Sequence, residues 1–230
     1  MKNFIKKHFL SVFTLLLFIN CDLVLAQEAG AISKLSGKAT ITSADNTSRD
    51  AAVSAKINTG DLITTSPDSE VLVRFKDNST MIVRSASKVK VSNFKFEKAA
   101  TDTVNTSLIA GTLRSVTGQI GKAQPSNVKF DAGAATIGIR GTDIELAIVP
   151  EGEKDRAGIY NYVHSGETNM SLDTGEELAV AKELTGFTPS ALKPGESRLQ
   201  LLRDRPAFLQ IGGFDALLQQ LTAPRIPAIR

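Results

Sequence analysis

The stretch VLVRFKDNSTMIVR, residues 71–84, is the clearest indication of the fold class, because it has the pattern of a β-hairpin. Val71, Val73 and Phe75 occupy alternate positions, so on an extended strand they would share one face. Asp77-Asn78 follows, and both residue types tolerate the positive φ of a tight turn. The stretch therefore predicts two antiparallel strands joined at Asp77-Asn78.

The same alternation continues on both sides of this hairpin. Short apolar runs separated by Gly, Asp, Asn, Ser and Pro extend from Ile32 to Gly195, with few stretches at helical spacing. A second strand pair is expected around residues 136–149 and 158–164, joined by a charged loop. We predict an all-β fold, and a sandwich, a barrel and a solenoid are all compatible with the pattern.

Less regular segments flank this second pair. Ser165-Gly166-Glu167 and Asp173-Thr174-Gly175 are turn signals that bracket an expected strand over residues 168–172. Residues 99–107 are polar and are expected to form a connector. Residues 118–122 lack the full glycine spacing and the Ser/Thr of a phosphate-binding loop, so we expect a turn there.

The pattern changes near the C-terminus. Phe214, Leu217, Leu218 and Leu221 fall at helical spacing and predict a short amphipathic helix. This helix either caps an open end of the β domain or docks on another envelope protein. The expected regions are a signal peptide at 1–26, a β domain at 27–200, and the helix with a proline-containing tail at 201–230.

The N-terminus has the features of a secretory signal peptide. A short basic stretch precedes the apolar run Phe9–Ile19, and Val24-Leu25-Ala26 suits a signal peptidase. Asn20-Cys21-Asp22 interrupts the apolar run well before the ~20 residues that span a bilayer. We expect cleavage after Ala26, no transmembrane span in the mature chain, and a periplasmic or secreted location. A lipoprotein anchored through Cys21 is the alternative.

Charge and residue types exclude several kinds of site. The formal net charge of +3 includes three lysines of the signal peptide, and elsewhere charges of both signs are interspersed, so we expect no nucleic-acid binding. Cys21 is the single cysteine, and His164 is the single histidine after the signal peptide. We therefore expect no metal site and no cofactor.

Catalytic groups are equally sparse. His164 is expected to lie at the surface or at a turn edge, because its neighbour Ser165 would point to the opposite side of a strand. Asp143 and Glu145 lie two positions apart and would share a strand face, as the carboxylates of a glycosidase do across a groove. The chain has no tryptophan for sugar stacking, and we expect it not to be an enzyme.

Two blocks carry a resemblance to a known family. Residues 56–65, KINTGDLITT, together with the hairpin that follows, resemble the characteristic segment of FecR domains. Residues 108–116, LIAGTLRSV, and 135–142, ATIGIRGT, are similar to that family's G-x-[LV]-R and A-x-I-G-[IV]-R-G-T pattern. The resemblance covers roughly residues 31–166. It implies a secreted β domain that binds a protein or an envelope polymer.

The resemblance also implies a regulator with a cytoplasmic anti-sigma segment, a transmembrane helix and a periplasmic domain. Here residues 1–8 precede the apolar run, so we expect no anti-sigma segment and no direct regulation of a sigma factor. Gly60, Gly138 and Gly141 of the motif are expected to serve the fold, by allowing unusual backbone conformations or close strand approach.

Two functions follow from these observations. The first is an envelope binding or scaffolding module that contacts a protein partner through turn loops and the C-terminal helix. The alternative is a carbohydrate-binding module for peptidoglycan or exported polysaccharide. Arg140 either pairs with a carboxylate, for which Asp61, Asp143 and Glu145 are the candidates, or contacts the partner. The candidate contact residues are Arg140, Tyr160, Tyr162, Phe214, Leu217, Leu218 and Leu221.

Overall fold

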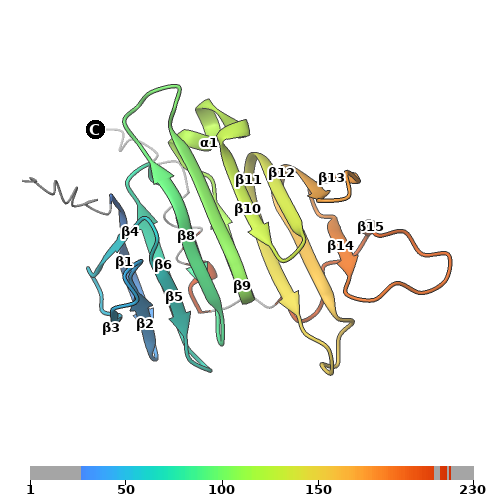
Figure 1. The fold of residues 1–230 in the computed structure, drawn as a ribbon, viewed down its shortest axis with the longest axis horizontal. Helices are drawn as coiled ribbons and strands as arrows, with labels where there is room; N and C mark the ends of the chain where they lie inside the picture. The colour runs from blue at the N-terminus through green and yellow to red at the C-terminus, as the bar shows by residue number, and fades with distance from the viewer. Residues whose placement is uncertain (1–26, 210–212, 217, 219–230) are drawn as a thin grey trace, which may run out of the picture.

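The computed structural model describes residues 27–209, 213–216 and 218, and most of them belong to one open β-sheet. The order of strand pairing shows that this sheet folds back on itself into two layers (Figure 1). Layer one contains β2 (Ala39–Thr42), β3 (Ser48–Asp50), β5 (Leu62–Thr65), β8 (Lys88–Lys95), β10 (Val128–Ala132) and β13 (Glu177–Ala181). Layer two contains β1 (Glu28–Ser36), β4 (Lys56–Asn58), β6 (Glu70–Phe75), β7 (Thr80–Val83), β14 (Thr185–Pro189) and β15 (Gln200–Leu202).

Three long strands pass from one layer into the other: β9 (Thr103–Val116), β11 (Ala135–Val149) and β12 (Gly158–Leu172). The first part of β9 pairs with β8 and β10, and its last part pairs with β7 and β11. The strands bend where glycines adopt a positive φ, at +62° for Gly141 in β11 and +78° for Gly166 in β12. A Cβ on Gly166 would lie 2.5 Å from the carbonyl oxygen of Gly141, so the two corners are packed backbone to backbone.

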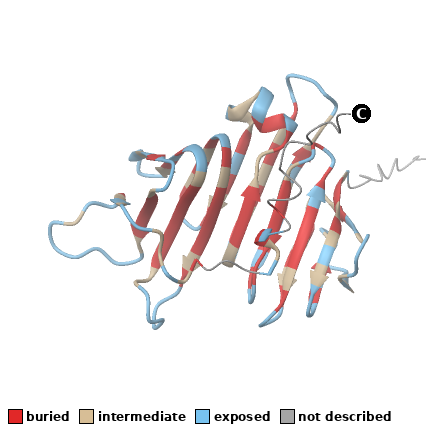
Figure 2. Cartoon of the chain, turned by 180° about the vertical axis from the view of Figure 1, so that it is seen from behind, coloured by how far each residue is buried: buried red, intermediate tan, exposed pale blue. Residues whose placement is uncertain are grey.

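The hydrophobic core lies between the two layers. Residues at alternate positions of each strand point inward, and they include Val71, Val73 and Phe75 of the predicted hairpin. The hairpin is confirmed as β6 and β7, with Asn78 at a φ of 64° in the turn. Figure 2 shows the buried positions running along the strands of both layers. Outward-pointing residues of layer two form a second surface, on which the candidate site lies.

The prediction of an all-β fold is confirmed, and the strand pairing is that of an open sheet folded into a sandwich, not of a closed barrel. The strand pair over β11 and β12 is also confirmed. The turn at residues 165–167 was a wrong prediction, because β12 continues through Gly166 as a bend. Residues 99–107 are only partly a connector, because β9 begins at Thr103.

The expectations for residues 118–122 and for the motif glycines also have outcomes in the structure. Residues 118–122 do not form a simple turn, because α1 (Gln119–Ala123) begins there and is followed by the 3-10 turn η1 (Pro125–Asn127). Gly60 has a positive φ as expected, whereas the Cβ position of Gly138 is 3.8 Å from its nearest neighbour and is not crowded. In the described part of the chain, no helix is long and apolar enough to cross a membrane.

The predicted C-terminal helix falls mostly outside the described residues. Asp215, Ala216 and Leu218 have helical geometry, whereas Leu217 and Leu221 lie outside the part of the chain that the structure describes. The amphipathic helix therefore stays a prediction. The signal peptide and Cys21 likewise lie outside the described residues.

Candidate binding face

The candidate site is the outer face of layer two, formed by side chains of β6, β7, β9, β11, β12 and β14 that point away from the core. We call residues 203–209, 213–216 and 218 the C-terminal segment, and it lies across this face (Figure 2). The contact has three parts: one apolar cluster at each end, and a charged cluster between them. Side chains make this contact, together with the backbone amide of Phe214, which donates to Glu70 Oε2 of β6 at 3.3 Å.

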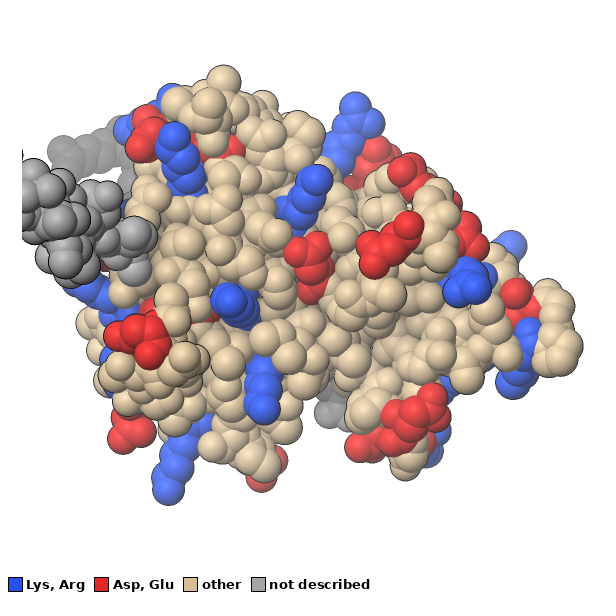
Figure 3. All heavy atoms as spheres, in the orientation of Figure 1, with Lys and Arg blue, Asp and Glu red and all other residues tan. Residues whose placement is uncertain are grey.

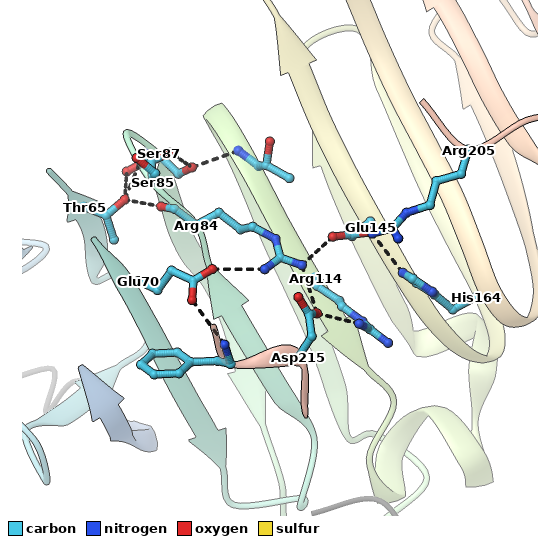
Figure 4. Close-up of polar contacts among 12 residues, drawn as sticks. Thr65, Glu70, Arg84, Ser85, Ser87, Arg114, Glu145, His164, Arg205 and Asp215 are labelled. Atoms are coloured by element: carbon cyan, nitrogen blue, oxygen red, sulfur yellow. Dashed lines mark hydrogen bonds and ion pairs between the residues drawn. The ribbon is translucent and has the colours of Figure 1, made fainter. Parts of the chain in front are cut away.

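Glu145 is the centre of the charged cluster (Figure 4). Its side chain is fully buried on β11 and accepts a hydrogen bond from Arg84 Nη2 at 2.5 Å. The other carboxylate oxygen accepts a bond from Arg205 Nη2 at 2.6 Å and is 2.9 Å from His164 Nε2. Three strands and the C-terminal segment thus meet at one carboxylate.

Two arginines of the sheet hold a carboxylate of the C-terminal segment. Asp215 Oδ1 accepts bonds from Arg84 Nη2 at 3.0 Å and from Arg114 Nη1 at 2.5 Å. Arg84 also donates from Nη1 to Glu70 at 3.0 Å, and Arg114 makes two parallel bonds to Asp143 at 2.9 and 2.7 Å. Such paired geometry fixes the orientation of a guanidinium group.

Oppositely charged neighbours keep the buried carboxylates and arginines of this cluster ionised. Burial raises the pKa of Glu145, but the hydrogen bond with His164 and the charges of Arg84 and Arg205 outweigh it and lower the pKa to about 2. Burial likewise raises the pKa of Asp215, and the bonds from Arg84 and Arg114 more than reverse this effect, so the net pKa is lowered. The pKa of Arg84 is raised above its ordinary value, because its carboxylate partners outweigh burial.

Two apolar clusters hold the C-terminal segment at opposite ends of the contact. Leu218 packs on Leu72 and Ile82, with Phe214 and Val116 beside them. At the other end Leu209 and Phe208 pack against residues of β11, β12 and β14, which are Ala147, Val149, Tyr160, Tyr162 and Phe187. Neither set belongs to the main core between the layers.

The structure separates the predicted contact residues into three groups. Arg140 has 78% of its side chain exposed and pairs with Glu167 at 3.0 Å, not with Asp61, Asp143 or Glu145. Tyr160 and Tyr162 are only 4% and 9% exposed, so sugar stacking on these rings requires departure of the C-terminal segment. Phe214 and Leu218 contact the outer face.

Two candidate catalytic positions are occupied by ion pairs. His164, expected at the surface or at a turn edge, lies two residues before the bend at Gly166 with 19% of its side chain exposed, and its ring contacts Glu145 and the edge of Tyr162. Asp143 and Glu145 share a strand face as predicted, but each is paired with an arginine. Among residues 27–209, 213–216 and 218, no cluster of His, Cys, Asp or Glu side chains is arranged to hold a metal ion.

Arg84, Arg114 and Asp215 were not identified from the sequence. Their signal is an outward position beside a core residue: Arg84 directly follows Val83 at the end of β7, and Arg114 follows Leu113 in β9. A charge at such a position predicts an exposed side chain unless a covering segment is known. In the view of Figure 3 the exposed charges of both signs are interspersed.

Part of this chain is similar to known proteins. Residues 61–167 match the family model described as "FecR protein". Two crystal structures of a candidate anti-sigma factor from Parabacteroides distasonis ATCC 8503 are 10% identical, with TM-scores of 0.49 and 0.48. Each match covers 62% of this chain and 59% of that chain. A structure described as a cell surface anchoring domain is 25% identical over 28% of this chain and 84% of its own, with a TM-score of 0.27. No curated protein matches.

Proposed function

Residues 61–167 form a FecR domain, and from this premise we propose that the protein is a non-catalytic binding module of the cell envelope. It contacts a protein partner through the outer face of layer two. The envelope location rests on the signal peptide predicted at residues 1–26.

The observation that carries this proposal is that the outer face already holds a peptide segment. The C-terminal segment is bound by side chains of six strands, through a carboxylate between two arginines and two apolar clusters. Apolar anchors combined with buried, paired charges are typical of protein–protein interfaces. A face with this chemistry suits a peptide better than it suits an uncharged polymer.

The carboxylates of this face support the absence of catalysis. A glycosidase needs one carboxylic acid that keeps its proton near neutral pH, and therefore a raised pKa. Glu145 has a pKa lowered to about 2, because its bonds with His164 and the two arginines outweigh burial. Asp143 is engaged by both Nε and Nη2 of Arg114. Both carboxylates thus serve as ion-pair partners.

Position-specific photo-crosslinking in the producing cell tests the proposal. Arg74 on β6 and Lys90 on β8 are both exposed basic residues, and they point outward from layer two and layer one respectively. A crosslinking amino acid at position 74 is expected to give a discrete protein adduct, and at position 90 none. Equal adducts from both positions, or none from either, would overturn the proposal. Pelleting of the protein with envelope polysaccharide in the absence of adducts would favour the carbohydrate alternative.

A further inference from the structure

The geometry points to a carboxylate-recognition site at Arg84 and Arg114, which the chain itself occupies with Asp215. We infer that the partner presents an acidic residue followed three positions later by leucine, and that it binds by displacing the C-terminal segment. This inference rests on the proposed function and specifies the chemistry of the partner.

The two guanidinium groups are held in place by the sheet, independently of Asp215. Arg84 is bonded to Glu70 and Glu145, and Arg114 is bonded twice to Asp143. Both arginine side chains are at least 90% buried. The site is therefore preorganised, and an entering carboxylate meets two donors that are already oriented (Figure 4).

Leucine at the third position after the carboxylate completes the pattern. Residues three apart on a helix lie on the same face, which is how Asp215 and Leu218 reach the sheet together. Leu218 covers Leu72 and Ile82, and both are 0% exposed in its presence. A partner that supplied the carboxylate alone would leave these two side chains in water, so both features are needed.

Displacement leaves the domain folded. None of the described residues of the C-terminal segment belongs to the main core, and the strand pairing of layer two does not include them. After Asp215 leaves, Arg84 and Arg114 each keep a sheet carboxylate, so neither becomes an unpaired buried charge. Because buried ion pairs add little net free energy over their desolvation, a competitor with the same groups exchanges readily.

The test measures competition in solution with the full chain and two fluorescent peptides. One peptide has the sequence of residues 203–221, RDRPAFLQIGGFDALLQQL. The other peptide carries Asn in place of the aspartate that corresponds to Asp215. The chain is used as wild type, as Asp215→Asn to weaken the internal contact, and as Glu167→Gln, a matched change at an exposed acid of layer one. Anisotropy titrations give the dissociation constants.

We expect the D215N chain to bind the aspartate peptide at least about tenfold more tightly than either other chain does. We expect the same D215N chain to bind the asparagine peptide at least about tenfold more weakly than the aspartate peptide. Binding of both peptides with equal affinity, or of neither, overturns the inference. A wild-type dimer in light scattering that D215N abolishes would assign the site to a second copy, and would equally overturn it. If peptides fail while the adduct at position 74 persists, the inference fails and the proposed function stands.

Discussion

Arg84 and Glu145 are 61 residues apart in the sequence, and Arg84 Nη2 donates to Glu145 Oε1 at 2.5 Å. Arg84 directly follows β7 and Glu145 lies on β11, so the bond crosses the intervening β9, which pairs with both strands. Because Glu145 is fully buried, removal of Arg84 leaves a carboxylate without one of its compensating charges. The ion pair is thus a cross-strand connection, and its loss has consequences that an exposed pair does not share.

Replacing Arg84 and Arg140 in turn compares the contribution to stability of a buried ion pair with that of an exposed one. The Arg84→Ala change is expected to lower the free energy of unfolding by about 3–5 kcal/mol, because it uncovers buried carboxylates. Arg140 pairs with Glu167 at the surface, where water screens the charges, so Arg140→Ala is expected to leave stability almost unchanged. Urea unfolding followed by circular dichroism measures both changes. Equal losses would contradict the assignment of the buried cluster.

The carboxylate of Glu145 makes stability depend on pH. Its pKa is lowered from the ordinary 4.5 to about 2 in the folded chain, so the unfolded chain takes up the proton first as the pH falls. The stabilisation is complete above about pH 4.5 and is lost as the pH falls towards 2. Between pH 6 and pH 3 this group alone accounts for about 2 kcal/mol.

The variant Glu145→Gln isolates this contribution. It is expected to be less stable than the wild type at pH 6, and to lose about 2 kcal/mol less between pH 6 and pH 3. Urea unfolding at several pH values gives the slope of the free energy of unfolding against pH for the wild type and for E145Q. Glu167→Gln at the exposed pair serves as the control. A slope in E145Q that equals the wild-type slope would show that Glu145 does not carry the dependence.

The strands were predictable because their signals are local. Val71, Val73 and Phe75 alternate with outward residues, and Asn78 marks the turn, so the sequence alone places this hairpin. The bend at Gly166 is different, because a glycine between two strands reads as a turn signal. Only the pairing of β11 with β12 on both sides of Gly166 shows that one strand continues into the other layer.

The candidate site was less predictable because its parts meet only in three dimensions. Asp143 and Glu145 were recognised as sharing a strand face, and the structure agrees. Their arginine partners come from the residue after β7 and from β9, and the spacing of residues along one strand holds no information on that pairing. Asp215 lies 101 residues beyond Arg114, and only the fold brings the two together.

Amide hydrogen exchange tests whether the C-terminal segment opens independently of the sheet. In the wild type the amide of Phe214 donates to Glu70 Oε2 at 3.3 Å, and that of Leu218 donates to Phe214 at 2.9 Å. In Asp215→Asn we expect at least about tenfold faster exchange at these two amides, because the bond to the two arginines is weakened. Amides of β11 are expected to keep their wild-type rates. A parallel increase in β11 would show that the segment and the sheet open as one unit.

The two bends at Gly141 and Gly166 give the sharpest test of the two-layer fold. A Cβ at Gly166 would lie 2.5 Å from the Gly141 carbonyl oxygen and 2.8 Å from that of Arg140, and both atoms belong to the backbone. Gly175 has a similar φ of +91° but has no atom within 4 Å of its Cβ position, so it is the matched control. Both substitutions place alanine at a positive φ, and the one at Gly166 adds this close backbone contact.

Gly175→Ala is expected to lower the free energy of unfolding by about 1–2 kcal/mol, which is the cost of a positive φ for alanine. Gly166→Ala carries the same cost together with displacement of the bend in β11, and a total loss of at least about 3 kcal/mol is expected. Urea unfolding of both variants at one pH gives the comparison. Equal losses would mean that the corners of β11 and β12 are not packed against each other, and that the two layers are joined in another way.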